Sequence, residues 1–318
     1  MESKFISPYP LKTAVLFIIF NRLDTTKEVF AAIKKAQVPR LYIASDGARA
    51  DKEDEEVKVQ AIRNYVTEHI DWDCEVKTLF REKNLSCGPS VKSAIDWFFS
   101  FEEEGIILED DVVPVQSFFY YCEELLEKYR DDFRVGMING TNHIGFLSEH
   151  DSYLFSKYKS GWGWATWKRA WINMDLEMNW THTEFQESIL WNMGHSKKSV
   201  KFWKSIIYQI KHNQVSAWDY QWAFSLASQN QLGIVPKNNL VANIGFGDDA
   251  THTFGSPKDS FIISKDIQFP LKHPVYILPN SDYDHQYETE ILRFAWKKFI
   301  PRFIRSFLKS FLTKIKSH

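Results

Sequence analysis

Three carboxylates in a row follow a short apolar run near the middle of the chain. Residues 105–108 (GIIL) lead directly into Glu109, Asp110 and Asp111. The apolar run is typical of a buried strand, and adjacent carboxylates at its end repel one another and are costly to bury without a partner. Hard divalent cations such as Mg²⁺ and Mn²⁺ bind carboxylate oxygens and complete their shell with water and substrate phosphates. The position of the acids therefore favours a metal–phosphate site over an acidic strand end that only faces solvent.

Two other apolar runs also end in polar residues. Arg22 follows the run at 14–20 and is either a surface charge or a guanidinium whose fork suits a phosphate. Asp46, in the sequence SDG, fits a common turn, and it could instead accept a hydrogen bond from a nucleobase edge. The chain has no Gly-rich phosphate loop of the dinucleotide or P-loop type. A phosphate at these strand ends would need a metal and basic side chains to neutralise it.

The second half of the chain contributes a further acid. Asp219 lies between aromatic residues in the sequence AWDYQW, at an expected helix start. Asp is a good N-cap, which is the structural interpretation. The alternative is a general base whose partly apolar surroundings raise its pKa toward its working range.

Two Gly-rich segments accompany this acid. SGWGWATW, at 160–167, is either core or a place where the indole faces of Trp162 and Trp164 lie open to a sugar ring. GFGDDATHT, at 245–253, contains Asp249 and His252 after two glycines that favour mobility, and would suit a lid over a bound ligand.

Alternating strands and helices position these residues. Strands are predicted at 13–20, 40–47, 74–80, 105–111 and 134–140, and helices at 24–37, 53–70, 90–103 and 116–130. Thr25 and Glu28 have capping-box spacing at the start of the first helix. The alternation predicts an α/β fold with a mostly parallel sheet covered by helices, in which ligands bind beyond the carboxyl ends of the strands.

The second half is less regular than the first. Helices are predicted at 198–212 and 218–230. A soft boundary near residue 150 divides a ligand-binding half (1–150) from a continuous substrate-accepting half (151–290), and a tail follows at 291–318.

Composition limits the classes of function. A formal net charge of −2 argues against binding nucleic acid over the whole surface. Three cysteines without metal spacing favour free thiols in a reducing compartment. The apolar run at 14–20 is too short for a signal peptide or a membrane span, so we expect a cytoplasmic protein.

The tail is basic and amphipathic. Residues 297–318 contain seven Lys or Arg and no acid, and apolar residues recur at helical spacing. We expect a helix that lies on an anionic membrane surface, which makes the protein peripheral on the cytoplasmic leaflet. A core or oligomer helix is the alternative.

Five segments in one order carry a resemblance to a known family. FNR, IASDG, ILEDDVVPVQSFF, SGWGWATW and AWDYQW resemble the corresponding segments of the GT-A nucleotide-sugar glycosyltransferases. Within these the chain looks most like the branch of the animal N-acetylglucosaminyltransferase that starts N-glycan branching, with its bacterial relatives. The resemblance spans about residues 13–255 and implies a GT-A type, Rossmann-like fold.

The resemblance implies a role for each matching residue. These roles are Arg22 at the nucleotide phosphate or ribose, Asp46 at the uracil edge, Glu109 at the donor sugar, Asp110 at the ribose, Asp111 as the single direct protein ligand to Mn²⁺ (or Mg²⁺), and Asp219 as catalytic base. The loop with Asp249 and His252 would close over the donor. The chain departs from the family at Tyr220, where a second acid is usual, and at residues 82–84, where the family has His-Tyr-Arg.

The implied reaction is inverting transfer from a UDP-sugar, by default UDP-GlcNAc, to a hydroxyl of a glycan or lipid-linked oligosaccharide in polysaccharide biosynthesis. Three alternatives remain open at this point. A sugar nucleotidyltransferase should have a Gly-rich phosphate loop after the first strand, where this chain has NRLDTT. A non-catalytic glycan-binding module would use the Trp residues but not the strand-end acids. A metal-dependent hydrolase would need His–carboxylate sets.

Overall fold

The computed structural model describes residues 5–145, 150–194, 196–215, 218–245 and 263–292 of the 318-residue chain. Its strands are β1 (Val15–Ile19), β2 (Arg40–Ser45), β3 (Glu75–Phe80), β4 (Glu104–Glu109), β5 (Val112–Pro114), β6 (Val135–Asn139), β7 (Tyr153–Ser156), β8 (Trp164–Trp167), β9 (Leu232–Pro236) and β10 (Val241–Asn243). Its helices are α1 (Leu23–Ala36), α2 (Glu55–Glu68), α3 (Cys87–Phe98), α4 (Gln116–Lys128), α5 (Lys168–Trp171), α6 (Gln186–Asn192), α7 (Lys197–Lys211), α8 (Asp219–Ser228) and α9 (Ser281–Gln286), with a 3-10 turn η1 (Asn179–His182) and a π-helical turn η3 (Tyr287–Leu292).

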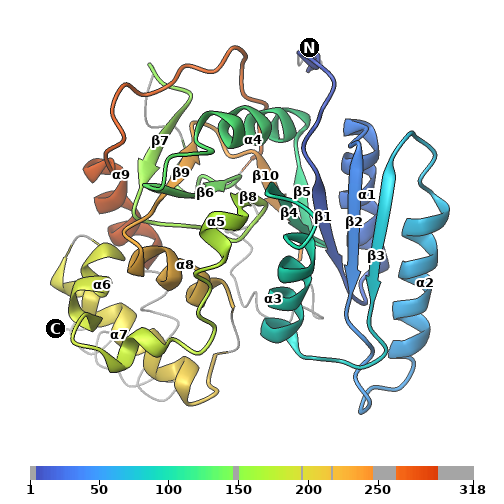
Figure 1. The fold of residues 1–318 in the computed structure, drawn as a ribbon, viewed down its shortest axis with the longest axis horizontal. Helices are drawn as coiled ribbons and strands as arrows, with labels where there is room; N and C mark the ends of the chain where they lie inside the picture. Colours follow the sequence, from blue (N-terminus) through green and yellow to red (C-terminus); the bar gives the residue numbers. More distant parts are fainter. Residues whose placement is uncertain (1–4, 146–149, 195, 216–217, 246–262, 293–318) are drawn as a thin grey trace, which may run out of the picture.

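One mixed sheet runs through the described part of the chain (Figure 1). Its eight strands have the order β3-β2-β1-β4-β8-β6-β9-β7, and β5 pairs with β10 in a separate two-stranded sheet. Strands β3, β2, β1 and β4 are parallel, β8 runs antiparallel to β4 and β6, β9 is parallel to β6, and β7 is antiparallel to β9. Only β7 and β8 oppose the other strands of this sheet, so the predicted mostly parallel, Rossmann-like α/β fold is confirmed.

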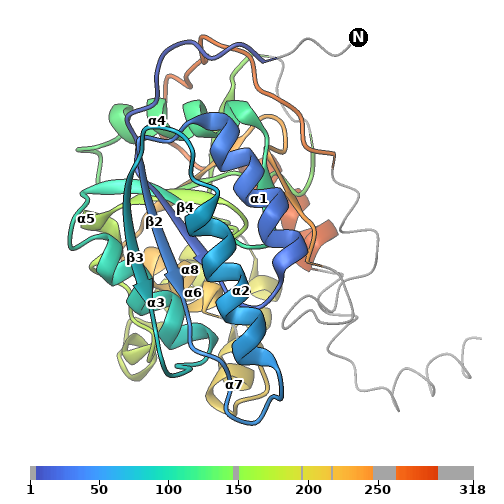
Figure 2. The same cartoon turned by 90° about the vertical axis from the view of Figure 1, so that its right-hand side faces the viewer.

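The two faces of the sheet carry different helices because successive side chains of a strand point to opposite faces. In β1, Val15 and Phe17 pack with α1, α2 and α4 in one core cluster, whereas Leu16 packs with α3, α5 and α8 in a second. In Figure 2, β2 and β3 lie between α3 and the pair α1 and α2. A third cluster joins α6, α7 and α8. Both faces of the strands that lead to the acids are therefore anchored in core.

The predicted capping box at the start of the first helix is wrong. Helix α1 begins at Leu23, its N-cap residue Arg22 makes no side-chain capping bond, and Thr25 lies inside the first turn. The Thr25 hydroxyl bonds back to the carbonyl of Arg22 at 3.3 Å. The earlier helix start places Arg22 at the junction of β1 and α1.

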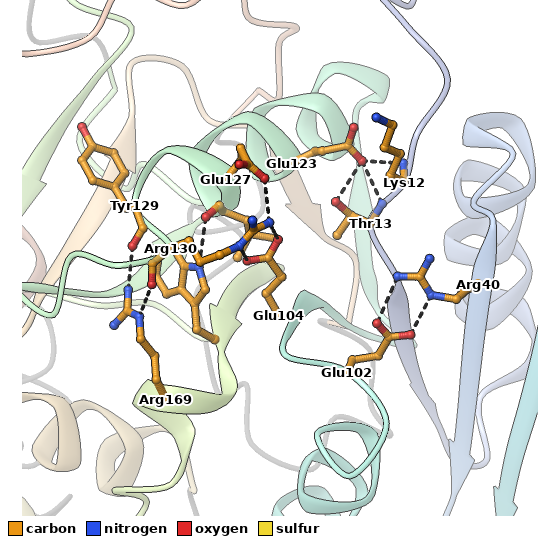
Figure 3. Close-up of polar contacts among 12 residues, drawn as sticks. Lys12, Thr13, Arg40, Glu102, Glu104, Glu123, Glu127, Tyr129, Arg130 and Arg169 are labelled. Carbon is orange, nitrogen blue, oxygen red and sulfur yellow. Dashed lines mark hydrogen bonds and ion pairs between the residues drawn. The ribbon is translucent and has the colours of Figure 1, made fainter.

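Ion pairs and hydrogen bonds tie the elements together near the amino ends of β1, β2 and β4 (Figure 3). Arg40 donates to both carboxylate oxygens of Glu102, at 2.7 and 3.0 Å. Arg130 binds both oxygens of Glu104, at 3.1 and 2.8 Å. These contacts stabilise the amino ends of the strands, at the end of the sheet opposite the acids. No helix among the described residues is long and apolar enough to cross a bilayer.

Candidate active site

The polar strand ends meet where the chain changes from one face of the sheet to the other. Helices α1 and α2 cover one face and α3 covers the other, so the direction of winding reverses between the adjacent strands β1 and β4. Open α/β sheets bind ligands at such a reversal, beyond the carboxyl ends of the strands. Arg22, after β1, and the acids after β4 lie at this point.

Arg22 is the positively charged partner of the acid turn. Glu109 is the last residue of β4, and Asp110 and Asp111 form the turn before β5. One guanidinium nitrogen of Arg22 donates to Oδ2 of Asp111 at 2.9 Å, and the other pairs with Oδ1 of Asp110. The backbone N–H of Phe20 donates to Oδ2 of Asp110 at 3.3 Å. The two aspartates are thus tied to the end of β1.

The β5–β10 pair brings a distant segment onto Asp111. The N–H of Ile244 donates to the carbonyl of Asp111 at 2.8 Å. Gly245 lies so close that a Cβ there would overlap Oδ2 of Asp111 and come within 2.9 Å of Arg22 Nη1. The start of the Gly-rich segment therefore lies against the acid turn. Asp249 and His252, the expected lid residues, lie outside the described residues.

Asp219, in the first turn of α8, lies within electrostatic range of Glu109. Trp218 is the N-cap residue and makes no side-chain capping bond, so the N-cap interpretation of Asp219 is wrong. A Cβ on Gly161 would lie 3.3 Å from Cβ of Asp219. Asp219 is exposed at the surface, yet the protein around it desolvates its carboxylate enough to raise its pKa.

Electrostatics link these acids in one site. Burial raises the pKa of Glu109 well above its usual value, and the charges of Asp111, Asp110 and Asp219 add to this effect. Burial also raises the pKa of Asp110 to about 6, although Arg22 opposes the shift. A site that disfavours this much negative charge is suited to a cationic or metal-bound ligand.

Asp46 is used in local structure at the end of β2. Asp46 is 9% exposed, and its carboxylate accepts hydrogen bonds from the N–H groups of Leu85 and Gly47, each at 3.0 Å. A Cβ on Gly47 would lie 2.5 Å from the carbonyl carbon of Lys83, so only glycine fits there. Asp46 therefore joins the β2 turn to residues 83–85.

The two tryptophans expected to face a sugar differ. Trp164 is fully buried in β8, where its ring packs near Trp171, Trp218 and Trp222, so the expectation of an open indole face is wrong for it. Its position opposite Ile107 of β4 explains this, because side chains of that register point into the core. Trp162 is only partly buried, and its ring centroid is 5.2 Å from that of His143.

Sequence reasoning missed Cys87. Helix α3 begins at Cys87, three residues earlier than predicted, and Pro89 in its first turn was the available signal. Burial raises the pKa of this thiol to about 12, with further contributions from the charges of Glu109, Asp219 and Asp46. The start of α3 therefore lies within electrostatic range of Glu109, Asp219 and Asp46.

Lys159 was also missed. Its ammonium is buried and has no hydrogen-bond partner among the described residues, and burial lowers its pKa to about 7. It lines a small cavity with Tyr158, His143 and Tyr287. Tyr287 in turn lies within electrostatic range of Asp219. One residue of this cavity wall thus senses the charge of Asp219.

The oxygen atoms that the protein offers here fit a hard divalent cation that would be coordinated mainly by the phosphates of a bound ligand and by water. Among the described residues no three His, Cys, Asp or Glu side chains gather as a closed metal site. Asp111 offers a partly exposed carboxylate beside a glycine. One carboxylate is sufficient when phosphates and water supply the other oxygens.

No protein-family model and no curated protein matches the chain. Among solved structures, the crystal structure of HddC from Yersinia pseudotuberculosis is similar to part of it. The match covers 45% of this chain and 59% of that chain, with 13% sequence identity and a TM-score of 0.28. A match with this coverage and TM-score supports no inference about function.

Proposed function

We propose that the protein is a metal-dependent glycosyltransferase of GT-A type that uses a nucleotide sugar. The observation that supports this best is the meeting of Arg22, Asp110 and Asp111 at the reversal between β1 and β4, with Asp219 of α8 within electrostatic range of the neighbouring Glu109. This arrangement offers one cation for phosphate, one carboxylate for a metal and one desolvated acid for proton transfer. The order of the five sequence motifs points the same way.

On the donor side, Arg22 and Asp111 are assigned to the diphosphate. Asp111 would hold Mn²⁺ or Mg²⁺, which as a Lewis acid lowers the charge of the departing nucleoside diphosphate. Arg22 would bind a phosphate through its planar fork. Asp110 and Glu109 would contact the ribose and the donor sugar. UDP is the first choice of nucleotide, with Asp46 at the base, and GlcNAc the first choice of sugar.

On the acceptor side, Asp219 is assigned as general base. It takes the proton of an acceptor hydroxyl as that oxygen forms a bond to the anomeric carbon and the bond to the nucleoside diphosphate breaks. Its raised pKa suits this role because a general base works best near the operating pH. A single displacement with one base inverts the anomeric configuration.

The structure weakens the nucleotidyltransferase alternative. The connection after β1 runs from Phe20 through Arg22 into α1 without a glycine, so it lacks the backbone cradle of a Gly-rich phosphate loop. A non-catalytic glycan module would have no use for an acid turn paired to an arginine at a strand reversal. The glycosyltransferase proposal accounts for both features.

The acceptor is proposed to be a glycan or a lipid-linked oligosaccharide. The basic residues of 297–318, which lie outside the described residues, would hold the protein on the cytoplasmic leaflet near such an acceptor. These assignments rest on the sequence.

The direct test is a panel of nucleotide sugars with Mn²⁺, scored for slow hydrolysis to the free sugar. We expect one UDP-sugar to be hydrolysed and the rate to vanish when EDTA removes the metal. The Asp219→Asn variant should bind the same nucleotide. If no nucleotide sugar binds or is cleaved with either Mn²⁺ or Mg²⁺, the proposal fails.

A further inference from the structure

The ion pairs of Arg22 occupy the carboxylate assigned to the metal. Nη1 of Arg22 donates to Oδ2 of Asp111 at 2.9 Å, while Nη2 holds Asp110. The Arg22 side chain is 25% exposed, and those of Asp110 and Asp111 are 5% and 13% exposed. Charges shielded from water to this degree interact more strongly than surface pairs do.

The main chain around this cluster is fixed on every side. The carbonyl of Arg22 accepts bonds from the N–H and the hydroxyl of Thr26, at 3.1 and 2.6 Å. Asp110 is bound to the N–H of Phe20, and the carbonyl of Asp111 to the N–H of Ile244. The long arginine side chain is therefore the part of this cluster with most freedom to change partners.

We propose that Arg22 is an internal counter-cation that keeps free divalent metal off Asp111 until an anionic ligand draws the guanidinium away. This inference rests on the proposed function, because the ligand it requires is a nucleoside diphosphate. A guanidinium binds phosphate and carboxylate oxygens with the same fork geometry, so the diphosphate competes with Asp110 and Asp111 for Arg22. Metal and nucleotide then bind together, and metal alone binds poorly.

The crowding at Gly245 supports this competition. Gly245 leaves no space for an added atom between itself and either Oδ2 of Asp111 or Nη1 of Arg22. Gly245 therefore closes one side of Oδ2 whether or not Arg22 is in place, and Nη1 of Arg22 occupies the same oxygen at 2.9 Å. Departure of the guanidinium frees the approach to Oδ2 that Arg22 now takes.

The test measures binding of Mn²⁺ alone to the full chain, by loss of the electron paramagnetic resonance signal of free Mn²⁺. The variants are Arg22→Gln, which removes the charge, and Arg22→Lys, which keeps the charge but cannot span both carboxylates. Arg40→Gln is the matched control. Arg40 makes a comparable two-point ion pair with Glu102, but at the amino end of β2, away from the acids.

For the wild type and Arg40→Gln we expect weak Mn²⁺ binding that UDP strengthens. For Arg22→Gln we expect Mn²⁺ alone to bind at least about tenfold more tightly, since one opposing unit charge has been removed, and UDP to strengthen it less. Arg22→Lys should be intermediate. Thermal unfolding should show Arg22→Gln less stable than the wild type without Mn²⁺ and restored by it.

Three other outcomes would contradict the inference. If Mn²⁺–UDP binds normally but Mn²⁺ alone binds Arg22→Gln and Arg22→Lys no more tightly than the wild type, the counter-cation role is wrong and the proposed function stands. Equal tightening in Arg40→Gln would mean that the effect is not local. If no variant binds Mn²⁺ with or without UDP, the metal assignment and this inference both fail.

Discussion

At the residue scale, the acids of the site differ in what neutralises them. Asp110 and Asp111 form ion pairs with Arg22, and burial still raises the pKa of Asp110 to about 6. Burial also raises the pKa values of Glu109 and Asp219, and the charges of neighbouring acids add to the effect at Glu109. An acid that is paired with an arginine and an acid that is only desolvated can carry out different tasks, one at a metal and the other in proton transfer.

Asp111→Asn should abolish Mn²⁺-dependent UDP binding and leave the fold intact. The amide removes the anionic oxygen assigned to the metal, while Asp110 still binds Arg22. Calorimetry with UDP, with and without Mn²⁺, measures this. Asp71→Asn, at an exposed ion pair with Lys34, is the control. Unchanged Mn²⁺–UDP affinity in the Asp111→Asn variant would remove Asp111 as a ligand.

Asp219→Asn should leave donor binding near normal and lower transfer by roughly 10²–10⁴, the range for loss of a general base. In the wild type, the rate should fall on the acid side at a higher pH than an ordinary Asp would give, because the pKa of Asp219 is raised and only its ionised form accepts a proton. Steady-state rates against pH check both statements. A variant with near wild-type transfer would make Asp219 a structural residue.

Lys159→Met should stabilise the protein most at low pH. The native pKa of Lys159 is about 7 and the unfolded value is 10.5, so the unfolded chain binds the extra proton between these values. Wild-type stability from this group therefore rises with pH across that window, and below it the burial penalty is fully present. Removing the amine should gain on the order of 5 kcal/mol below the window and nothing above it.

Urea unfolding at pH 6 and pH 9.5 measures this difference. Lys204→Met is the control, because Lys204 is 48% exposed and paired with Glu187. An advantage of the Lys159→Met variant that does not change with pH would show that the amine is already neutral or hydrated in the native state.

At the element scale, the sequence was most informative where elements are regular. Buried runs such as 105–108 and the amphipathic spacing of α1 and α4 follow from local pattern, so the alternation of strands and helices along the first half of the chain could be predicted. With it came the location of Arg22 and the acids at the carboxyl ends of their strands, but not the pairing of β1 with β4. The antiparallel course of β8 could not, because it depends on pairing with β4 and β6 across a less regular half.

The same limit applies to the site. Trp164 was misplaced because its exposure depends on register in β8 rather than on its neighbours in sequence. Cys87 and Lys159 were missed because a single thiol and a single amine carry no spacing. The contact of Gly245 with Asp111 comes from the β5–β10 pair, which no local pattern predicts.

Gly163→Ala should destabilise the protein by about 1–3 kcal/mol. Gly163 has a φ of +53°, and a Cβ there would lie 2.8 Å from Cγ1 of Val241. Gly161→Ala is the comparison, since its Cβ would meet Asp219 at 3.3 Å without a positive φ, and we expect it to lower activity more than stability. Urea unfolding and transfer assays separate the two. Equal stability of both variants would contradict the strain argument.

At the scale of the whole molecule, we expect the described core and the basic tail to have separate tasks. Within the described residues, three hydrophobic clusters already cover both faces of the sheet and join α6, α7 and α8. A chain cut after residue 296 should therefore stay folded and keep activity on short soluble acceptors.

The same truncation should abolish binding to vesicles of phosphatidylglycerol and phosphatidylcholine at low salt. Each of the seven basic side chains of 297–318 is expected to contribute on the order of 1 kcal/mol near an anionic leaflet. Co-sedimentation of the full and shortened chains measures this. A full-length chain that ignores anionic vesicles, or a shortened chain that unfolds, would assign the tail to a core or an oligomer instead.

The antiparallel strand β8 has a consequence for modularity. It enters the sheet between β4 and β6, so residues from beyond position 150 separate two strands from before it. A fragment ending at 150 would expose β4 as an unpaired edge, which invites aggregation. We therefore expect that residues 1–150 cannot be joined at this point to the second half of a different protein and still fold. A change of acceptor specificity would have to come through substitutions and loops within one folding unit.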